Sequence, residues 1–318
     1  MVPYLKYLKL LIRIVVSNVF PSLILKASSK STAQARYCYS VWMRHLITAH
    51  ANGFTEMPIK VAEFGPGKSI GIGLCAMLCG VNEYYGLDAV KHAFSDRNLQ
   101  ILSELVNMYK RKERIPDETE FPRITPTLED YSFPSHILTD ELLLSSLADD
   151  RIERIRHAII SSQTENTDIP EKVEYIAPWS AGDVNLSDVD FVYSQAVLEH
   201  IDDLDCAYSV MAGISRDGCY LSHSVDFKSH GAAEKWNGHW ACSEAFWKLL
   251  RGRRPYWINR QPLSAHLELC RKNGFNILEV KKAEMRSDSI ERKRLKHPFE
   301  SISEEDFTTS GAHILCKS

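Results

Sequence analysis

The chain lacks the features that mark several classes of protein. Its eight cysteines form no CxxC pair, and its 318 residues contain no internal repeat and no low-complexity tract. With 44% hydrophobic and 25% charged residues the composition is that of a globular protein, which excludes disordered, collagenous and disulfide-scaffold classes. Scattered cysteines are typical of reduced thiols in the cytoplasm. The formal net charge of -3 gives no reason to expect a nucleic-acid partner.

Acidic residues are also missing from the N-terminal segment. The first acid is Glu56, so residues 1–50 have a charge of +7 and the remainder -10. The longest uncharged stretch there has 12 residues, well below the roughly 20 of a membrane-spanning helix, and Arg13 interrupts any signal peptide. Apolar residues at helical spacing in 4–20 predict a basic amphipathic helix. It either docks on an anionic membrane through residues 1–25 or packs on the core.

Residues 1–55 are therefore assigned to basic N-terminal helices, and a second helix at 33–52 is expected to cap the core. The main domain is 56–318, where strands and helices alternate as in a doubly wound parallel sheet. Its expected strands are 59–64, 84–88, 173–177, 190–194, 219–223, 276–281 and 312–316; its helices are 69–79, 90–109, 203–214 and 264–273. The insertion 110–172, with one helix at 139–162, is long enough to form a lid or substrate-side element.

The turn after the first expected strand allows several nucleotide-type interpretations. The fingerprint GxGxxG fails because Ile70 stands where the third glycine belongs. The phosphate-loop pattern GxxxxGK[ST] is met by Gly67-Lys68-Ser69 but begins at Ala62, which would shorten the strand to 59–61. A phosphate-loop nucleotide-binding protein remains an alternative.

The third interpretation depends on an ordered set of motifs. Glu63-x-Gly65-x-Gly67, Asp88 at the end of the second strand, the segment 190–200 and Gly218 occur in this order. The set resembles class I S-adenosylmethionine-dependent methyltransferases over about residues 59–316. That resemblance implies an α/β, doubly wound, Rossmann-like sheet of seven strands, six parallel and one antiparallel, with S-adenosylmethionine as cofactor.

The resemblance also implies roles for individual residues. Gly65 and Gly67 would pass under the methionine part of the cofactor, Glu63 would face its amino group, and Asp88 would hold both ribose hydroxyls. Asp183 or Trp179 would meet the adenine. Ser194, near the end of the fourth strand, is a further expected cofactor contact. A carboxylate that ends a strand at a switch point can accept two hydroxyl protons, which agrees with the role of Asp88.

A second constellation, the aromatic and histidine-rich segment 223–262, is expected near the acceptor. A histidine has the pKa suited to a general base, so His223 or His200 is expected to remove the acceptor's proton, with Asp226 beside them. The expected substrate contacts are His230, Trp236, His239, Asn259 and Arg260. This mixture favours O-methylation of a hydroxylated acceptor such as a sugar or glycan intermediate, and it resembles a methyltransferase subgroup of bacterial glycan biosynthesis.

Three questions stay open from the sequence. His223, Asp226, His230 and His239 are metal-ligand types, but their spacing matches no known signature, so a metal is not favoured. The same residues could serve structural hydrogen bonding. A non-catalytic scaffold at the membrane surface is the remaining alternative to an enzyme, and the acceptor, the atom methylated and the oligomeric state are undetermined.

Overall fold

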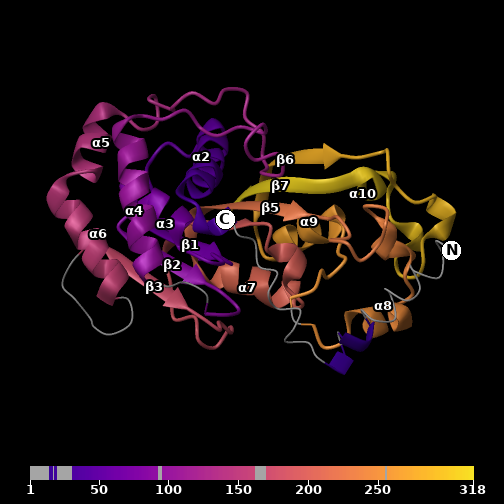
Figure 1. Ribbon diagram of the computed structural model, residues 1–318. Coiled ribbons are helices and arrows are strands. Elements are labelled where there is room, and N and C mark those ends of the chain that lie inside the picture. The colour runs from indigo at the N-terminus through magenta and orange to yellow at the C-terminus, as the bar shows by residue number, and fades with distance from the viewer. Residues whose placement is uncertain (1–13, 17, 20–30, 92–94, 162–169, 255) are drawn as a thin grey trace.

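The computed structural model describes residues 14–16, 18–19, 31–91, 95–161, 170–254 and 256–318. Within them lies one seven-stranded sheet with strand order β3-β2-β1-β4-β5-β7-β6 (Figure 1). The strands are β1 (Lys60–Phe64), β2 (Glu83–Leu87), β3 (Lys172–Ile176), β4 (Val189–Gln195), β5 (Ser215–Asp226), β6 (Asn276–Glu284) and β7 (Thr309–Lys317).

The direction of the strands confirms the predicted fold class. Strands β1 to β5 pair in parallel, whereas β7 runs antiparallel to both β5 and β6. The sheet therefore has six strands in one direction and one reversed. The order turns back on itself between β1 and β4, and in open α/β sheets such a switch point forms a crevice at the carboxyl edge.

Helices cover both faces of this sheet. On one face, α2 (Ala35–Ala51), α3 (Gly71–Leu78), α4 (Ser95–Lys110) and α6 (Asp149–Ser161) enclose a large apolar cluster. On the other, α7 (Leu204–Ile214) and α9 (Leu263–Lys272) pack over a second cluster. Helix α2 is almost wholly buried, which confirms that the second N-terminal helix caps the core. The predicted helix at 4–20 lies mostly outside the described residues.

The insertion differs from its prediction in one respect. The single helix expected at 139–162 is two helices, α5 (Asp140–Ser146) and α6. The break lets α6 begin with two acids, which suit a helix N-terminus. It also aims the buried Arg151 at the carbonyls of Met77 (2.7 Å) and Val81 (2.8 Å). The proline-rich part of the insertion reaches the sheet, because the Ser224 hydroxyl donates to the carbonyl of Thr125 (2.7 Å).

Helix α8 (Glu244–Arg251) was not predicted, because the surrounding aromatic segment looked irregular. Ser243 caps it by accepting a hydrogen bond from the Phe246 N–H.

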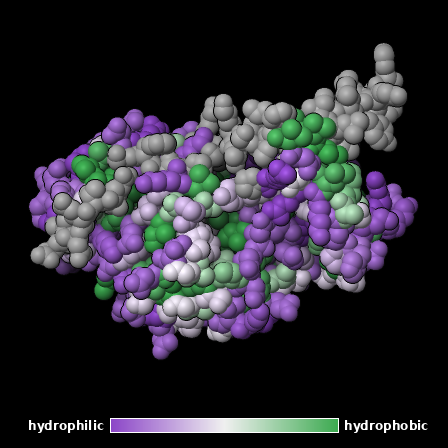
Figure 2. Space-filling view, turned by 90° about the horizontal axis from the view of Figure 1, so that it is seen from below, coloured by the Kyte–Doolittle hydropathy of each residue, from purple (hydrophilic) through white to green (hydrophobic). Residues whose placement is uncertain are grey.

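Phe246 and Leu249 of α8 are exposed, as are Val15 and Val19. Figure 2 shows apolar side chains gathered on part of the face seen from below. Within the described residues no helix is long and apolar enough to cross a bilayer.

Candidate functional site

The carboxyl edge of β1 continues into a glycine turn. Gly65 and Gly67 have φ of +73° and +74°, a region that L side chains rarely adopt. A Cβ added to Gly65 would lie 2.5 Å from Val197 Cγ2, so this backbone touches the loop that follows β4. The Gly65 N–H donates to the Leu87 carbonyl (2.8 Å). The turn is thus held against both neighbouring strand ends.

Residues 31–33, which precede α2, contact this turn through Thr32. The Lys68 N–H donates to Thr32 Oγ1 (3.1 Å), and the Ser69 hydroxyl donates to the Thr32 carbonyl. Ala62 lies inside β1 and is paired with both β2 and β4. A phosphate loop starting at Ala62 would have to unpair those residues, so the fold contradicts the phosphate-loop alternative.

Glu63 lies beneath the turn rather than in it. Its side chain is 1% exposed, and Oε2 accepts hydrogen bonds from the hydroxyls of Tyr84 (2.7 Å) and Tyr193 (3.2 Å). Burial raises its pKa to about 8, although the two tyrosine hydrogen bonds act in the opposite direction. Its observed contacts brace β1 against β2 and β4, and its contact with a ligand amino group stays a prediction.

Asp88 directly follows β2 and faces the same turn. Its Oδ2 accepts a hydrogen bond from the Gly67 N–H (2.9 Å) and its Oδ1 accepts one from the Ala89 N–H (2.7 Å). The Tyr175 hydroxyl lies 3.3 Å from Oδ2 but donates its single proton to the nearer Val90 carbonyl (2.9 Å). The residue is 9% exposed. A carboxylate has about four acceptor sites, so the two backbone hydrogen bonds leave capacity for two ligand hydroxyls.

The residues expected near an adenine lie after β3. The Trp179 N–H donates to the Asp88 carbonyl (3.0 Å), and its ring packs edge-on against Phe64. Asp183 is exposed in the next turn and accepts a hydrogen bond from the Ser180 hydroxyl (2.6 Å). Trp179 is therefore joined directly to Asp88, whereas Asp183 forms its hydrogen bonds within its own turn.

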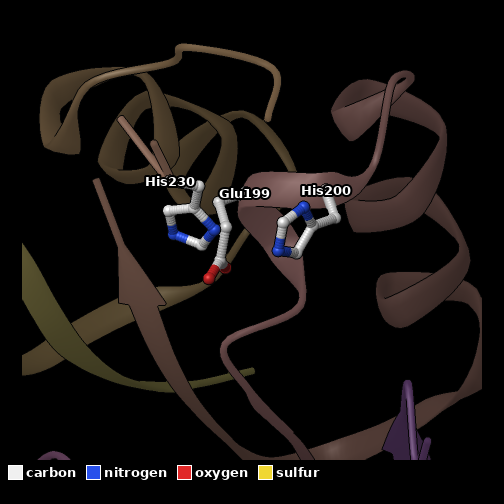
Figure 3. A group of neighbouring side chains, drawn as sticks. All are labelled: Glu199, His200 and His230. Carbon is white, nitrogen blue, oxygen red and sulfur yellow. The ribbon is translucent and has the colours of Figure 1, made fainter. Parts of the chain in front are cut away.

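A polar cluster occupies the carboxyl ends of β4 and β5. Glu199 and His200 belong to the short helix η3 (Leu198–His200), and His230 lies in the loop after β5. The rings of His200 and His230 are 5.0 Å apart, and His230 Nε2 lies 3.4 Å from Asp226 Oδ2. Figure 3 shows the Glu199 carboxylate between the two imidazoles. Val197 connects this cluster to Gly65.

Burial and charge set the protonation of these groups. Burial, and to a smaller extent the neighbouring His230, lower the pKa of His200 to about 4. Burial alone would raise the pKa of Asp226, but the hydrogen bond with His230 and the charge of Lys228 bring it below its ordinary value. His200 is therefore neutral and Asp226 ionised near neutral pH.

Asn259 holds the η3 turn in place. Its side-chain amide donates to the carbonyls of Leu198 (2.7 Å) and Ile201 (2.8 Å), and its backbone N–H donates to the Glu199 carbonyl (2.7 Å). The next residue, Arg260, is buried, where it pairs with Glu244 and donates to the Cys242 carbonyl (3.1 Å). Both residues were expected to contact substrate; their observed partners are protein groups that position the cluster.

Three more residues of the second constellation lie in the core. His223 is 0% exposed, and its Nδ1 lies 2.9 Å from Ser194 Oγ, with Tyr208 beside the ring. Burial lowers its pKa to about 3. Trp236 and His239 are buried around Trp240. Within the described residues neither His223 nor His239 joins His230 in a group of neighbouring ligand atoms, so the four-residue set considered from the sequence is not assembled.

The sequence did not predict that Glu199 is a site residue, nor that Tyr256 connects parts of the site. Tyr256 has φ +56°, and its hydroxyl donates to the Ala89 carbonyl (3.3 Å) beside Asp88. Its backbone also raises the pKa of His200 through a hydrogen bond. It therefore bridges the Asp88 side and the His200 side of the edge. An acid beside His200 was visible in the sequence, but nothing there indicated that its carboxylate would be buried.

No protein-family model and no curated protein matches the chain. Among solved structures, similar ones include an S-adenosylmethionine-dependent methyltransferase from Methanosarcina mazei, 12% identical over 85% of this chain and 96% of that one, with TM-score 0.44. Phosphoethanolamine N-methyltransferase 2 from Haemonchus contortus is 14% identical over 91% and 58%, with TM-score 0.41. Magnesium protoporphyrin IX methyltransferase from Synechocystis is 12% identical over 89% and 82%, with TM-score 0.40. Likeness at this level carries no argument about activity.

Proposed function

We propose that the chain is an S-adenosylmethionine-dependent methyltransferase. One observation carries the proposal: the Asp88 carboxylate, at the end of β2, faces the positive-φ turn of Gly65 and Gly67 at the switch point of the sheet. The sheet has the mixed direction that the resemblance implies. Open α/β sheets bind ligands at this edge.

The residues at the edge fit the cofactor. Asp88 keeps capacity for ribose hydroxyls, and Gly65 and Gly67 give the loop the positive φ values that its turn at this edge requires. Trp179, whose backbone N–H donates to the Asp88 carbonyl, is the aromatic residue that we place against the adenine ring. Glu63 supports the loop from below through Tyr84 and Tyr193.

When bound, the cofactor supplies a methyl group activated on a sulfonium sulfur. The acceptor oxygen would bond to the methyl carbon while the carbon–sulfur bond breaks and its electron pair stays on sulfur. We place loss of the acceptor's proton at the Glu199, His200 and His230 cluster with Asp226, rather than at His223, because only the cluster lies at the open edge. Positioning of the two reactants would supply most of the rate.

The acceptor in this proposal is a hydroxylated small molecule such as a sugar or glycan intermediate. The support is the density of hydrogen-bonding groups at the ends of β4 and β5, where His230 is exposed and His200 half-buried. Trp236 and His239, expected to contact the acceptor, are buried in packing. Recognition would therefore depend on polar groups more than on stacking against tryptophan.

Calorimetric titration of the purified protein with S-adenosylhomocysteine, beside ATP with magnesium, tests this function. We expect one molecule of S-adenosylhomocysteine bound per chain and no heat from ATP, because Ala62 is locked in β1. Binding of ATP alone would overturn the proposal. Heat from neither ligand would favour the scaffold alternative, since a fold without its cofactor site has no route to methyl transfer.

We further propose peripheral contact with an anionic membrane through residues 1–25. The support is their basic charge and the exposed apolar side chains of Val15, Val19, Phe246 and Leu249. The two segments meet where the Asn18 side-chain amide donates to the Leu249 carbonyl (3.2 Å). Apolar burial and anionic lipid attraction act together in such contacts. We expect the full chain to float with phosphatidylserine vesicles several-fold more than a chain beginning at Ser31. Equal flotation would remove the membrane contact and leave the enzyme proposal intact.

A further inference from the structure

The cluster at the ends of β4 and β5 combines three side chains that ligate metals. Glu199, His200 and His230 each offer one ligand atom, and these atoms all lie within 4.8 Å of one another (Figure 3). The side chains come from two separate loops. Glu199 is buried, His200 is half-buried and His230 is exposed, so an ion could enter from the His230 side.

The Glu199 carboxylate is buried without compensation from the protein. It is 3% exposed, and within the described residues neither of its oxygens has a hydrogen-bond partner. The same is true of His200 Nδ1. An uncompensated buried carboxylate is costly, and a cation would supply the missing partner.

The surroundings preorganise these ligands. Asn259 fixes η3 on both sides of Glu199 through its bonds to Leu198 and Ile201. Asp226 Oδ2 lies 3.4 Å from His230 Nε2, which leaves Nδ1 of His230 to face an ion. A carboxylate on the second nitrogen of a ligating histidine orients the ring and raises its basicity. The cluster therefore has both ligands and their supporting partners.

We propose that Glu199, His200 and His230 bind a divalent transition-metal cation. Two imidazoles and one carboxylate suit Zn²⁺ and related ions, and three protein ligands leave coordination positions open. Ligand atoms about 2.1 Å from one ion lie at most about 4.2 Å apart, so small side-chain rotations complete the site. In this proposal the bound ion lowers the pKa of the acceptor's hydroxyl group. That role depends on the proposed methyltransferase function, whereas binding of the ion does not.

Calorimetry on the full chain, stripped with a chelator and then dialysed, tests the site with Zn²⁺ and Mn²⁺ as probes. We expect one ion per chain and a rise in melting temperature on its addition. Glu199→Gln and His230→Asn should each weaken binding by more than about 100-fold, above the 10–100-fold of a supporting partner. The matched controls Glu300→Gln and His157→Gln, both at exposed positions, should bind as the wild type does.

The other outcomes are equally decisive. No saturable binding of either ion to the wild type would overturn the site and leave Glu199 as a neutral, protonated acid. Equal binding by the wild type and Glu199→Gln would place the ion elsewhere and overturn it too. Titration of the same samples with S-adenosylhomocysteine separates the two proposals: retained binding of that ligand without ion binding would contradict the metal site alone.

Discussion

Asp88→Ala is expected to weaken binding of S-adenosylhomocysteine by about 100-fold or more. Hydrogen bonds to a charged group are worth about 1.5–3 kcal/mol each, so loss of two bonds to ribose hydroxyls removes at least about 3 kcal/mol, or a factor of more than 100. The substitution also removes the partner of the Gly67 N–H, which loosens the turn. Calorimetric titration measures the affinity directly.

Two variants make this prediction sharper. Asp88→Asn keeps an oxygen that can accept from the Gly67 N–H but loses the charge, so an intermediate loss of about 10-fold is expected. Lys68→Ala changes the same turn, yet Lys68 uses its backbone N–H toward Thr32, so the affinity should stay within about threefold. Unchanged binding by a folded Asp88→Ala protein, or a larger loss in Lys68→Ala, would contradict the assignment of Asp88.

The strands and the cofactor edge were predictable because their signals are local. Glu63 to Gly67 combines a strand end with glycines, and both glycines do adopt positive φ. Asp88 follows a short apolar run in the sequence, which predicted that it lies at the end of the second strand. In the structure it directly follows β2. Each of these inferences needed only a few neighbouring residues and the rule that carboxyl ends of parallel strands share one edge.

His223 shows why the acceptor side was harder to predict. The sequence suggested a strand ending at 223, but β5 continues to Asp226, so His223 is an internal strand residue. Side chains alternate between faces along a strand, and His223 lies on the same face as Leu221 and Val225, both of the α7 and α9 cluster. The end of the strand, and hence the open edge, belongs to Asp226.

The cluster itself depends on contacts between distant segments. The turn that contains Glu199 is held by a hydrogen bond from Asn259, which lies 60 positions later in the chain. His230 approaches Glu199 from the loop after β5. The composition of residues 223–262 showed that polar and aromatic side chains gather in this segment. It could not tell which of them pack in the core, such as Trp236 and Trp240, and which face solvent. Such a distinction is decided by tertiary packing, which the local pattern does not contain.

Acid is expected to unfold this protein well above the pH at which carboxylates normally protonate. Burial lowers the pKa of five core histidines: to about 4 for His45 and His266, to about 3 for His223 and His239, and well below its usual value for His313. These imidazoles stay neutral in the folded state, whereas in the unfolded chain they bind protons below their ordinary pKa of 6.5. Stability therefore falls as the pH decreases from about 6.5 toward 4.

The size of the effect follows from the proton count. Between pH 7 and 5.5 the five histidines together cost roughly 6 kcal/mol of unfolding free energy. Glu63 acts in the opposite direction, because its raised pKa makes the folded state bind a proton that the unfolded state lacks, and it offsets about 2 kcal/mol. Glu199, whose pKa burial also raises, acts like Glu63, whereas His200, whose pKa burial lowers, acts like the core histidines and largely cancels it. The net loss of roughly 4 kcal/mol is a large part of the roughly 5–15 kcal/mol that stabilises a typical domain.

Urea unfolding followed by circular dichroism between pH 7 and 5.5 measures this slope. His266→Asn removes one core histidine, which bonds the Tyr208 hydroxyl (3.1 Å), so its unfolding free energy should depend on pH with a slope about one proton smaller than that of the wild type. His157→Gln replaces an exposed histidine and should leave the slope unchanged. An unfolding free energy that stays level over this range would mean that the core imidazoles are protonated in the folded state, each with a partner that the described packing does not contain.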